Sequence, residues 1–218
     1  MEAVSARQIA SCLGTAALTV GFLLAAPAPS ASADGCPDVE VIFARGTGEP
    51  PGIGSVGQAF VDSLSSRVGG KSVGVYPVNY PATLNVLHAA AGANDAIGHM
   101  NHMAANCPNT RIVLGGFSQG AYVMDLVTGA PMPSLGFDGP PAPDIANDVA
   151  AVAVFGNPAY RMLGGPLSSL SPLYAGKAID LCNGNDPICS SGSDRSAHSL
   201  YVQSGMTTQA ANYVARLV

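Results

Sequence analysis

The segment 116–120 reads Gly-Phe-Ser-Gln-Gly and lies between two segments of different character. Residues 111–115 form a short run rich in Ile, Val and Leu, typical of a buried strand, whereas residues 121–127 suit a helix. A serine flanked by glycines between a strand and a helix is the pattern of a nucleophile elbow, a sharp turn that exposes the serine hydroxyl above a sheet. The alternative is an ordinary glycine-flanked turn. The first interpretation predicts that Ser118 is a catalytic nucleophile.

The rest of the chain repeats this alternation of strands and helices. The pattern predicts strands at 39–44, 72–78, 111–115, 149–155 and 177–181, and helices at 57–68, 86–106, 121–127 and 208–218. The strand at 149–155 is apolar throughout, as expected where helices cover both faces of a sheet. Two Gly- and Pro-rich stretches, 129–143 and 156–172, predict loops. The alternation predicts an α/β fold with a parallel sheet between helices.

The first 33 residues have the features of a secretory signal peptide. Arg7 precedes a mostly apolar stretch at 9–26, and residues 31–33 offer small side chains at a cleavage site. A membrane anchor is the alternative, but polar residues and glycines interrupt the stretch and no second apolar span follows it. We therefore expect cleavage, a single mature domain at 34–218, and secretion.

Charge and composition narrow the classes of partner. The chain has a net charge of −5 and only nine Lys and Arg residues, which are scattered along it. A nucleic-acid-binding protein needs a basic patch, so we expect no nucleic-acid partner.

Four of the five cysteines lie in the predicted mature chain, and Cys12 falls in the signal peptide. An even number of cysteines in an oxidising compartment predicts disulfides, for which three pairings exist. We favour Cys182–Cys189, which are close in sequence, and Cys36–Cys107, at the edges of predicted elements. Loop entropy predicts that the short bridge stabilises the fold by about 2.5 kcal/mol and the long one by about 4 kcal/mol. A zinc site at Cys182 and Cys189 lacks further ligands at a suitable spacing.

A serine nucleophile needs a base to accept its proton and a carboxylate to orient that base. In α/β-hydrolases the acid and then the histidine follow the nucleophile along the chain. His198 is the one histidine that follows Ser118. We therefore expect His198 to be the base.

Several aspartates follow the serine, so the acid is less constrained. Asp186 is favoured because it lies just beyond a predicted strand, within the loop that Cys182–Cys189 would clamp. Asp194 is the second candidate, in a Gly- and Ser-rich segment typical of a solvated loop. Asp125 would lie on the helix that runs away from the catalytic face, and Asp180 inside a strand.

Attack by the serine on a carbonyl would also need two N–H donors for the developing negative charge. The backbone N–H of Gln119, at the start of a helix, is one candidate. The second should come from a loop after an early strand, and the Arg-Gly-Thr-Gly segment at 45–48 ends the first strand. Thr47 offers its hydroxyl as well as its amide.

Two further motifs suggest ligand sites. The G-x-G-x-x-G motif at 52–57 is separated from the preceding strand, and no acidic residue follows at the spacing of a dinucleotide site. Asp95, His99 and His102 share one helix face, but no further ligands converge on them, and a solvated helix face is the better interpretation. We expect neither a metal nor a cofactor. The apolar residues of 132–137 and 162–163 either line an acyl groove or touch a lipid surface, or they pack the loops onto the core.

Four segments in this order carry a family resemblance: 43–47 (Phe-Ala-Arg-Gly-Thr), 116–120, 182–189 and 197–201 (Ala-His-Ser-Leu-Tyr). With them the chain resembles the cutinase family of serine esterases. The segments at 45–51 (Arg-Gly-Thr-Gly-Glu-Pro-Pro) and 79–82 (Asn-Tyr-Pro-Ala) are similar to its secreted mycobacterial branch. The resemblance implies a small αβα sandwich of the α/β-hydrolase type, with a central, mainly parallel sheet and no separate lid domain.

The resemblance also implies hydrolysis of carboxylic esters through an acyl-enzyme, and the same two disulfides. Carried onto this sequence, the implied residues are Ser118, Asp186 and His198 for catalysis, Thr47 and Gln119 for the oxyanion, and Leu84 and Ile188 for substrate binding. Fungal members have an apolar flap before the histidine, whereas residues 190–195 here are polar. Because this segment is polar, we expect soluble or dispersed esters of short to medium acyl chains as substrates. We also expect a monomer that makes transient contact with a lipid surface. The alternative is a non-catalytic secreted surface or antigen-like protein on this scaffold.

Overall fold

The computed structural model describes residues 35–218. The predicted signal peptide at 1–33 lies outside these residues. The described chain forms a five-stranded sheet of order β2-β1-β3-β4-β5, in which every pairing is parallel. The strands are β1 Val39–Ala44, β2 Val73–Pro77, β3 Arg111–Phe117, β4 Val149–Phe155 and β5 Ala178–Leu181. All five predicted strands are thereby confirmed.

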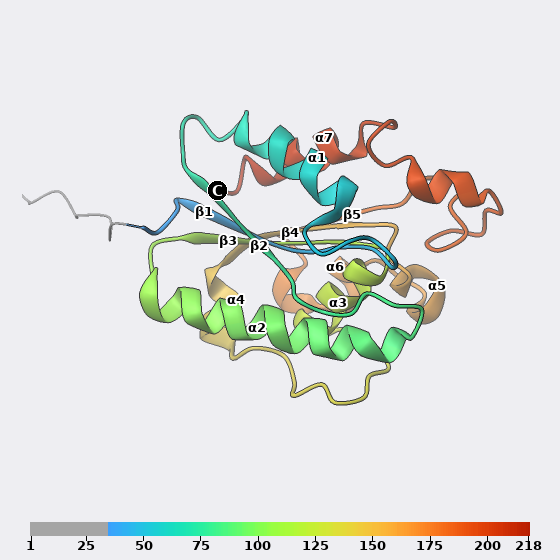
Figure 1. Cartoon of the computed structure of the whole chain (residues 1–218), viewed down its shortest axis with the longest axis horizontal. Helices are drawn as coiled ribbons and strands as arrows, with labels where there is room; N and C mark the ends of the chain where they lie inside the picture. Colours follow the sequence, from blue (N-terminus) through green and yellow to red (C-terminus); the bar gives the residue numbers. More distant parts are fainter. Residues whose placement is uncertain (1–34) are drawn as a thin grey trace, which may run out of the picture. The chain divides into compact units, whose positions relative to one another are not determined.

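Helices cover both faces of this sheet (Figure 1). One face packs against α1 Gly54–Ser65 and α7 Met206–Val214. The other packs against α2 Ala89–Asn106 and α3 Gln119–Val127, with the short helices α4 Pro143–Asp148, α5 Ala159–Leu163 and α6 Leu167–Leu170. Three 3₁₀ turns complete the elements: η1 Val86–His88, η2 Pro172–Tyr174 and η3 Arg195–Ser199. This is the αβα sandwich that the family resemblance implies.

The sequence of β1 shows how the two layers are built. Val41 and Phe43 pack with α1 and α7, whereas Ile42 and Ala44 pack with α2 and α3. Alternate residues of a strand point to opposite faces of the sheet. A strand that is apolar at nearly every position is therefore expected where helices cover both faces. All six residues of β1 are buried.

The two stretches predicted as loops are partly helical. The stretch 156–172 contains α5 and α6, and α4 begins at Pro143, the last residue of the stretch 129–143. Each of these three helices has only four to six residues and buries a single one of them: Ala146, Ala159 and Leu167. A helix that buries one residue leaves no apolar periodicity in the sequence, which is why the prediction missed all three.

The strand order places the functional loops at one end of the sheet. β1 and β3 are neighbours at the centre, and the chain leaves them in opposite directions, which makes their carboxyl ends the topological switch point where open α/β sheets bind ligands. Thr47 follows β1 and Ser118 follows β3.

Both favoured disulfides are present. Cys36–Cys107 joins the segment before β1 to the end of α2, and Cys182–Cys189 closes the loop after β5. Among residues 35–218, no helix is long and apolar enough to span a membrane.

Candidate active site

Ser118 occupies a sharp turn between β3 and α3. Its φ of 57° and ψ of −116° lie outside the regions that residues with a side chain usually adopt. The turn needs glycine on both sides. A Cβ added to Gly116 would lie 2.2 Å from the carbonyl oxygen of Gly120, and a Cβ added to Gly120 would lie 1.9 Å from the carbonyl oxygen of Ala44. The geometry is that of an elbow held against the end of β1, and an ordinary turn would not need this close approach.

A continuous chain of hydrogen bonds starts at the Ser118 hydroxyl. Ser118 Oγ lies 2.8 Å from Nε2 of His198, and Nδ1 of His198 lies 2.6 Å from Oδ2 of Asp186. The Asp186 side chain is fully buried, whereas one fifth of the His198 side chain is exposed. The three predicted residues are therefore brought together, although 80 residues separate the serine from the histidine. This geometry allows a proton to pass from the hydroxyl to the imidazole.

The loop closed by Cys182–Cys189 holds the Asp186 carboxylate from several sides. The backbone N–H of Ile188 donates to Oδ1 at 2.8 Å, and the Tyr201 hydroxyl donates to Oδ2 at 2.6 Å. Tyr201 is fully buried, and this burial together with the Asp186 hydrogen bond raises the pKa of its hydroxyl, which therefore remains a donor. No local pattern marks Tyr201 as a functional residue, although it lies three residues after His198 in the segment 197–201.

The other aspartates do not contact His198. Asp194 is exposed, and its Oδ1 accepts from the hydroxyl of Ser196 at 2.6 Å and from its N–H at 2.9 Å, which lowers the pKa of Asp194. Asp194 thus caps η3, the turn that carries His198. Asp125 and Asp180 share a hydrogen-bond partner, Asn157, that the sequence analysis did not identify.

Two aromatic rings enclose the imidazole of His198. The Phe117 ring lies against it at a centroid distance of 4.9 Å, and the Tyr201 ring meets it edge-on at 6.2 Å. Phe117 is the last residue of β3, so the strand that positions the serine also limits the movement of the histidine.

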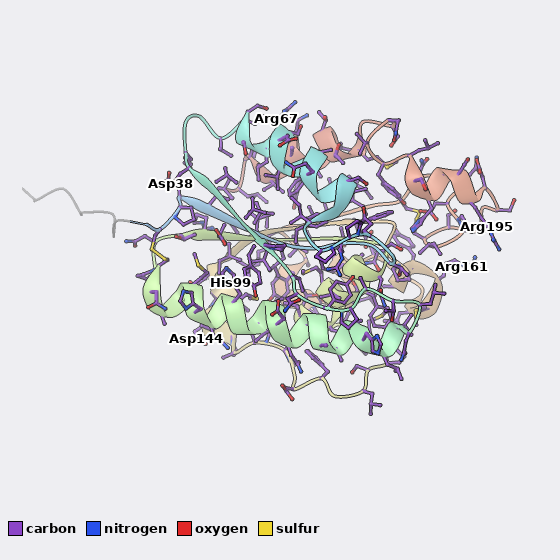
Figure 2. The ribbon with its side chains drawn as sticks, in the orientation of Figure 1. Asp38, Arg67, His99, Asp144, Arg161 and Arg195 are labelled. Atoms are coloured by element: carbon purple, nitrogen blue, oxygen red, sulfur yellow. A yellow bond between two sulfur atoms is a disulfide. The ribbon has the colours of Figure 1, made fainter. Side chains whose placement is uncertain are left out.

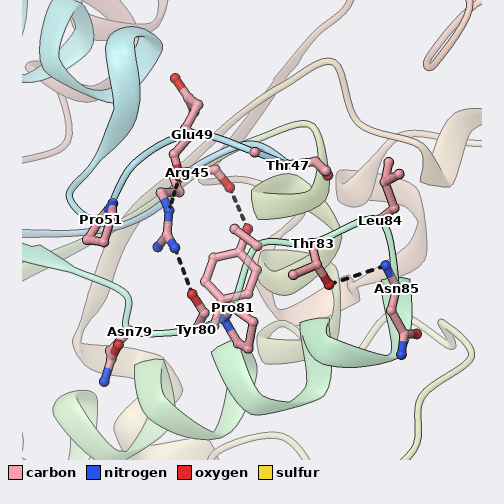
Figure 3. Close-up of a pocket in the computed structure, with 12 residues that line it drawn as sticks. Arg45, Thr47, Glu49, Pro51, Asn79, Tyr80, Pro81, Thr83, Leu84 and Asn85 are labelled. Atoms are coloured by element: carbon pink, nitrogen blue, oxygen red, sulfur yellow. Dashed lines mark hydrogen bonds between the residues drawn. The ribbon is translucent and has the colours of Figure 1, made fainter.

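The loop after β1 lies beside the start of α3. Thr47 Oγ1 donates to Oε1 of Gln119 at 3.1 Å, so the two residues expected to bind an oxyanion are adjacent. Arg45 braces this loop by donating to the carbonyl of Glu49 at 2.9 Å and to that of Tyr80 at 2.8 Å (Figure 3).

The Glu49 carboxylate occupies the start of α1. Its Oε2 accepts from Gly46 N–H at 2.7 Å, and its Oε1 accepts from Ser55 N–H at 2.9 Å. A dinucleotide pyrophosphate would need the N–H groups at this helix start. The G-x-G-x-x-G motif therefore surrounds a carboxylate of the chain itself.

Two clefts adjoin the site. A cleft of about 820 Å³ lies between segments 45–51 and 79–85, lined by Thr47 and by Leu84, whose side chain is 91% exposed (Figure 3). A second, mostly apolar cleft of about 370 Å³ is lined by Pro187, Ile188, Arg195 and His198. Each of the two predicted substrate-binding residues thus lines a cleft that reaches one of the candidate catalytic groups.

The helix face that could have bound a metal packs against the sheet instead. His99 on α2 stacks on Tyr76 of β2 at a centroid distance of 3.6 Å and contacts the Glu40 carboxylate at 3.0 Å (Figure 2). Asp95 accepts from the Tyr76 hydroxyl at 3.1 Å. The expectation of a solvated face is correct only for His102, because Asp95 and His99 are half-buried.

The apolar residues of 132–137 and 162–163 are partly buried in the core and partly exposed, and none of them lines either cleft. Met132 is buried in the core beside α3, whereas Leu135 is 71% exposed and Met162 is 48% exposed.

Known proteins of related sequence match the same part of the chain that the structure describes. The family model described as Cutinase matches residues 35–218. The chain is 57% identical over 207 residues to a Mycobacterium tuberculosis protein named probable carboxylesterase Culp3, covering 94% of this chain and 78% of that one. It is 55% identical over 216 residues to phospholipase Culp4 of the same organism, covering 98% and 93%.

Solved structures agree with the sequence relatives. A Trichoderma reesei cutinase in complex with a phosphonate inhibitor superposes with a TM-score of 0.66 at 31% identity, covering 84% of this chain and 77% of that one. An acetylxylan esterase superposes with a TM-score of 0.71 at 27% identity, covering 84% and 99%. A family match over the whole described chain, on this fold, establishes that the protein belongs to the cutinase family.

Proposed function

We propose that this protein is a secreted serine esterase that hydrolyses carboxylic esters of short to medium acyl chains through an acyl-enzyme. The observation that carries the proposal is the unbroken hydrogen-bonded chain from Ser118 through His198 to Asp186. Membership of the cutinase family and relatives named as carboxylesterase and phospholipase support ester hydrolysis as the reaction class.

In the acylation step, Nε2 of His198 takes the hydroxyl proton while Ser118 Oγ bonds to the ester carbonyl carbon. The carbonyl oxygen gains the negative charge, which the N–H groups of Thr47 and Gln119 stabilise. The Thr47 hydroxyl adds a third donor when it turns from Gln119 Oε1 to the oxyanion. When the tetrahedral intermediate collapses, the bond to the alcohol oxygen breaks and His198 gives its proton to the leaving alcohol. The acyl group remains on Ser118.

In the deacylation step, a water molecule takes the place of the alcohol. His198 accepts a proton from this water, whose oxygen attacks the acyl carbon, and then returns a proton to Ser118 Oγ as the carboxylic acid leaves. Asp186 stays ionised and orients the imidazole through Nδ1 in both steps. The proton transfers involve only these side chains, the ester and water, so the proposed reaction uses no cofactor.

The surroundings of the site favour an open, adaptable substrate position. The cleft beside Thr47 combines the apolar Leu84 with the polar side chains of Asn79 and Asn85. Leu84, Val86 and Leu87 are all exposed, which suits transient contact with a dispersed lipid. The polar segment 190–195 on the other side of the site favours soluble or dispersed esters over a waxy polyester surface.

Secretion is proposed from the N-terminal sequence and the disulfides together. Residues 1–33 have the signal-peptide pattern, and two disulfides persist in an oxidising compartment. Expression of the full chain in a secreting bacterial host should yield a product in the medium whose N-terminus lies near Asp34. A product that stays in the membrane fraction with its N-terminus intact would contradict secretion.

Active-site labelling tests the proposed reaction. The wild-type protein should react with a fluorophosphonate probe and hydrolyse nitrophenyl esters, with rates that peak within a series from acetyl to dodecanoyl. Ser118→Ala should lose labelling and lower turnover by roughly three orders of magnitude or more. Ser134→Ala, at an exposed position in the segment 129–143, is the matched control and should behave as the wild type.

Two results would separate the proposal from its alternative. A wild-type protein that neither binds the probe nor hydrolyses any ester would favour the non-catalytic secreted protein. Unchanged hydrolysis by Ser118→Ala would remove the nucleophile assignment. Adding phospholipid micelles to the assay then distinguishes a lipid-directed enzyme from one that prefers soluble esters.

A further inference from the structure

The turn at the end of β4 binds the backbone of Ser118 and lies beside the imidazole of His198. The carbonyl of Phe155 accepts a hydrogen bond of 2.9 Å from the backbone N–H of Ser118. Gly156 has a φ of +60° and faces the imidazole, because an added Cβ would lie 2.9 Å from Cε1 of His198. The position of this turn therefore affects the backbone of the nucleophile and the space available to the base.

The next residue, Asn157, anchors the turn through the hydrogen bonds of its side-chain amide. Its side chain is completely buried, and its Nδ2 donates to Oδ1 of Asp125 at 3.0 Å and to Oδ2 of Asp180 at 3.0 Å. Its Oδ1 accepts from the Ala159 N–H at 2.9 Å, so all of its polar atoms are used. The amide cannot rotate without losing these bonds.

The two carboxyl groups belong to the elements that carry the rest of the proposed machinery. Asp125 lies on α3, which begins directly after Ser118, and Asp180 lies on β5, which leads into the Asp186 loop. Leu167 N–H donates to Asp180 Oδ2 at 3.0 Å and holds that carboxyl from α6. The amide of Asn157 thus connects the elements that carry the nucleophile and the acid, at the turn that faces the base.

This polar cluster is costly to bury, so its presence needs a reason. Among the described residues, Asp125 Oδ2 and Asp180 Oδ1 have no hydrogen-bond partner. Burial raises the pKa of Asp180 to about 6 and that of Asp125 well above its usual range. Apolar side chains of similar size would fill the space at a lower cost, but they would not fix direction as hydrogen bonds do.

We propose that Asn157 is a positioning residue for ester hydrolysis, whose amide bridges the carboxyl groups of Asp125 and Asp180 and thereby holds the turn at Phe155 and Gly156 in register with Ser118 and His198. The inference rests on the proposed function. Loss of the bridge lets the turn shift, and a displacement of the reacting groups by a fraction of an ångström lowers the rate of the chemical step more than substrate affinity.

Four variants test this role: Asn157→Ala, Asp180→Ala, Asp180→Asn and the control Thr110→Val. Thr110 is also buried and its Oγ1 donates to the Pro37 carbonyl at 2.6 Å, but it directly precedes β3, at the opposite end of that strand from Ser118. Its replacement should lower stability without affecting the site. Each variant is assayed with a nitrophenyl ester and with the fluorophosphonate probe, at a temperature where circular dichroism shows it folded.

Asn157→Ala and Asp180→Ala should lower kcat and the probe-labelling rate constant about tenfold, with KM within about twofold of the wild type. Asp180→Asn keeps an acceptor for Asn157 and should restore kcat to near the wild-type value. Thr110→Val should keep kcat despite a lower melting temperature. This split between kcat and KM, with rescue by the conservative variant, is not expected of a role in stability alone.

The positioning role is overturned if folded Asn157→Ala and Asp180→Ala keep the kcat of Thr110→Val. If Asn157→Ala does not fold, Asp180→Ala tests the positioning role by the same comparison of kcat, because Asp180 is only half-buried and its replacement should disturb folding less. The proposed function is tested separately, because full activity in Ser118→Ala would overturn it whatever the Asn157 variants show.

Discussion

The hydroxyl of Tyr201 and the imidazole of His198 bind the same carboxylate oxygen, Oδ2 of Asp186, each at 2.6 Å. The tyrosine also receives a hydrogen bond of 3.2 Å from Asn183 N–H, at the base of the same disulfide loop. Asp186 therefore has a second buried donor that fixes the direction of its carboxylate toward the histidine. The hydroxyl of Tyr201 acts on the proposed reaction through this aspartate, whereas its ring packs edge-on against the imidazole of His198.

Removing the Tyr201 hydroxyl should weaken both the fold and the site. Tyr201→Phe keeps the ring that packs on Phe155 but deletes a hydrogen bond to a buried charged group, which should lower the unfolding free energy by about 1.5–3 kcal/mol. Because Asp186 then loses one of its two restraints on Oδ2, kcat should fall about fivefold to tenfold. Urea unfolding and ester hydrolysis measure the two effects.

Tyr213→Phe is the control for this substitution. Tyr213 is a half-buried residue of α7, and its hydroxyl donates to the Gly176 carbonyl at 3.3 Å in a hydrogen bond that is exposed to solvent. Its removal should change neither measurement appreciably. Equal kcat in Tyr201→Phe and Tyr213→Phe would mean that the hydroxyl does not orient the acid.

The two disulfides should separate stability from activity. Replacing Cys36 and Cys107 by alanine opens a loop of 71 residues and should cost about 4 kcal/mol, with kcat preserved wherever the protein is folded. Replacing Cys182 and Cys189 opens a loop of seven residues and should cost only about 2.5 kcal/mol, but kcat should fall because that loop holds Asp186. A larger loss of kcat in the Cys36/Cys107 variant would contradict this assignment.

The residues that could be predicted from sequence are those with a short local pattern or a fixed order along the chain. Ser118 is marked by its glycines and by the strand and helix around it, and His198 is the one histidine that follows it. The strands β1, β3 and β4 could be predicted because burial on both faces makes them apolar, whereas the edge strands β2 and β5 are mostly half-buried. Patterns of this kind can be recognised from neighbouring residues alone, without knowledge of contacts between distant parts of the chain.

The residues that were missed are defined by partners far away in the sequence. Asn157 lies 32 residues from Asp125 and 23 from Asp180, and no local pattern marks a buried amide between two carboxyl groups. Tyr201 lies three residues after the histidine, but its hydroxyl gains its role only when the loop of Asp186 folds against it.

The buried carboxyl of Asp180 should make stability depend on pH. Burial raises its pKa from the ordinary value of 3.8 to about 6, so the folded protein retains a proton that the unfolded chain has already released. The unfolding free energy should therefore fall as the pH rises from about 4 to 6, and the contribution of this group is complete below about 4. Two pKa units correspond to about 3 kcal/mol, which is an upper bound for a half-buried group.

Asp180→Asn removes this titration and should flatten the curve. Unfolding free energies from urea titrations at several pH values should show the wild type losing stability relative to the variant across this interval. Parallel curves for the two proteins would exclude Asp180 as the titrating group.

The close approach of the elbow to β1 should make its glycine irreplaceable. A Cβ at Gly120 would meet the Ala44 carbonyl oxygen at 1.9 Å, and this backbone oxygen cannot move without disturbing the sheet. Gly120→Ala should therefore lower the unfolding free energy by an overpacking cost of about 3 kcal/mol or more, with a lower melting temperature. It should also lower kcat, because α3 shifts away from the end of β1.

Gly98→Ala is the matched control, since an added Cβ at this position within α2 meets nothing within 4 Å. That variant should gain about 0.5–1 kcal/mol, because alanine restricts the unfolded chain more than glycine does. If Gly120→Ala were as stable as Gly98→Ala, the turn at Ser118 would not depend on contact with β1, and the strained serine would need another cause.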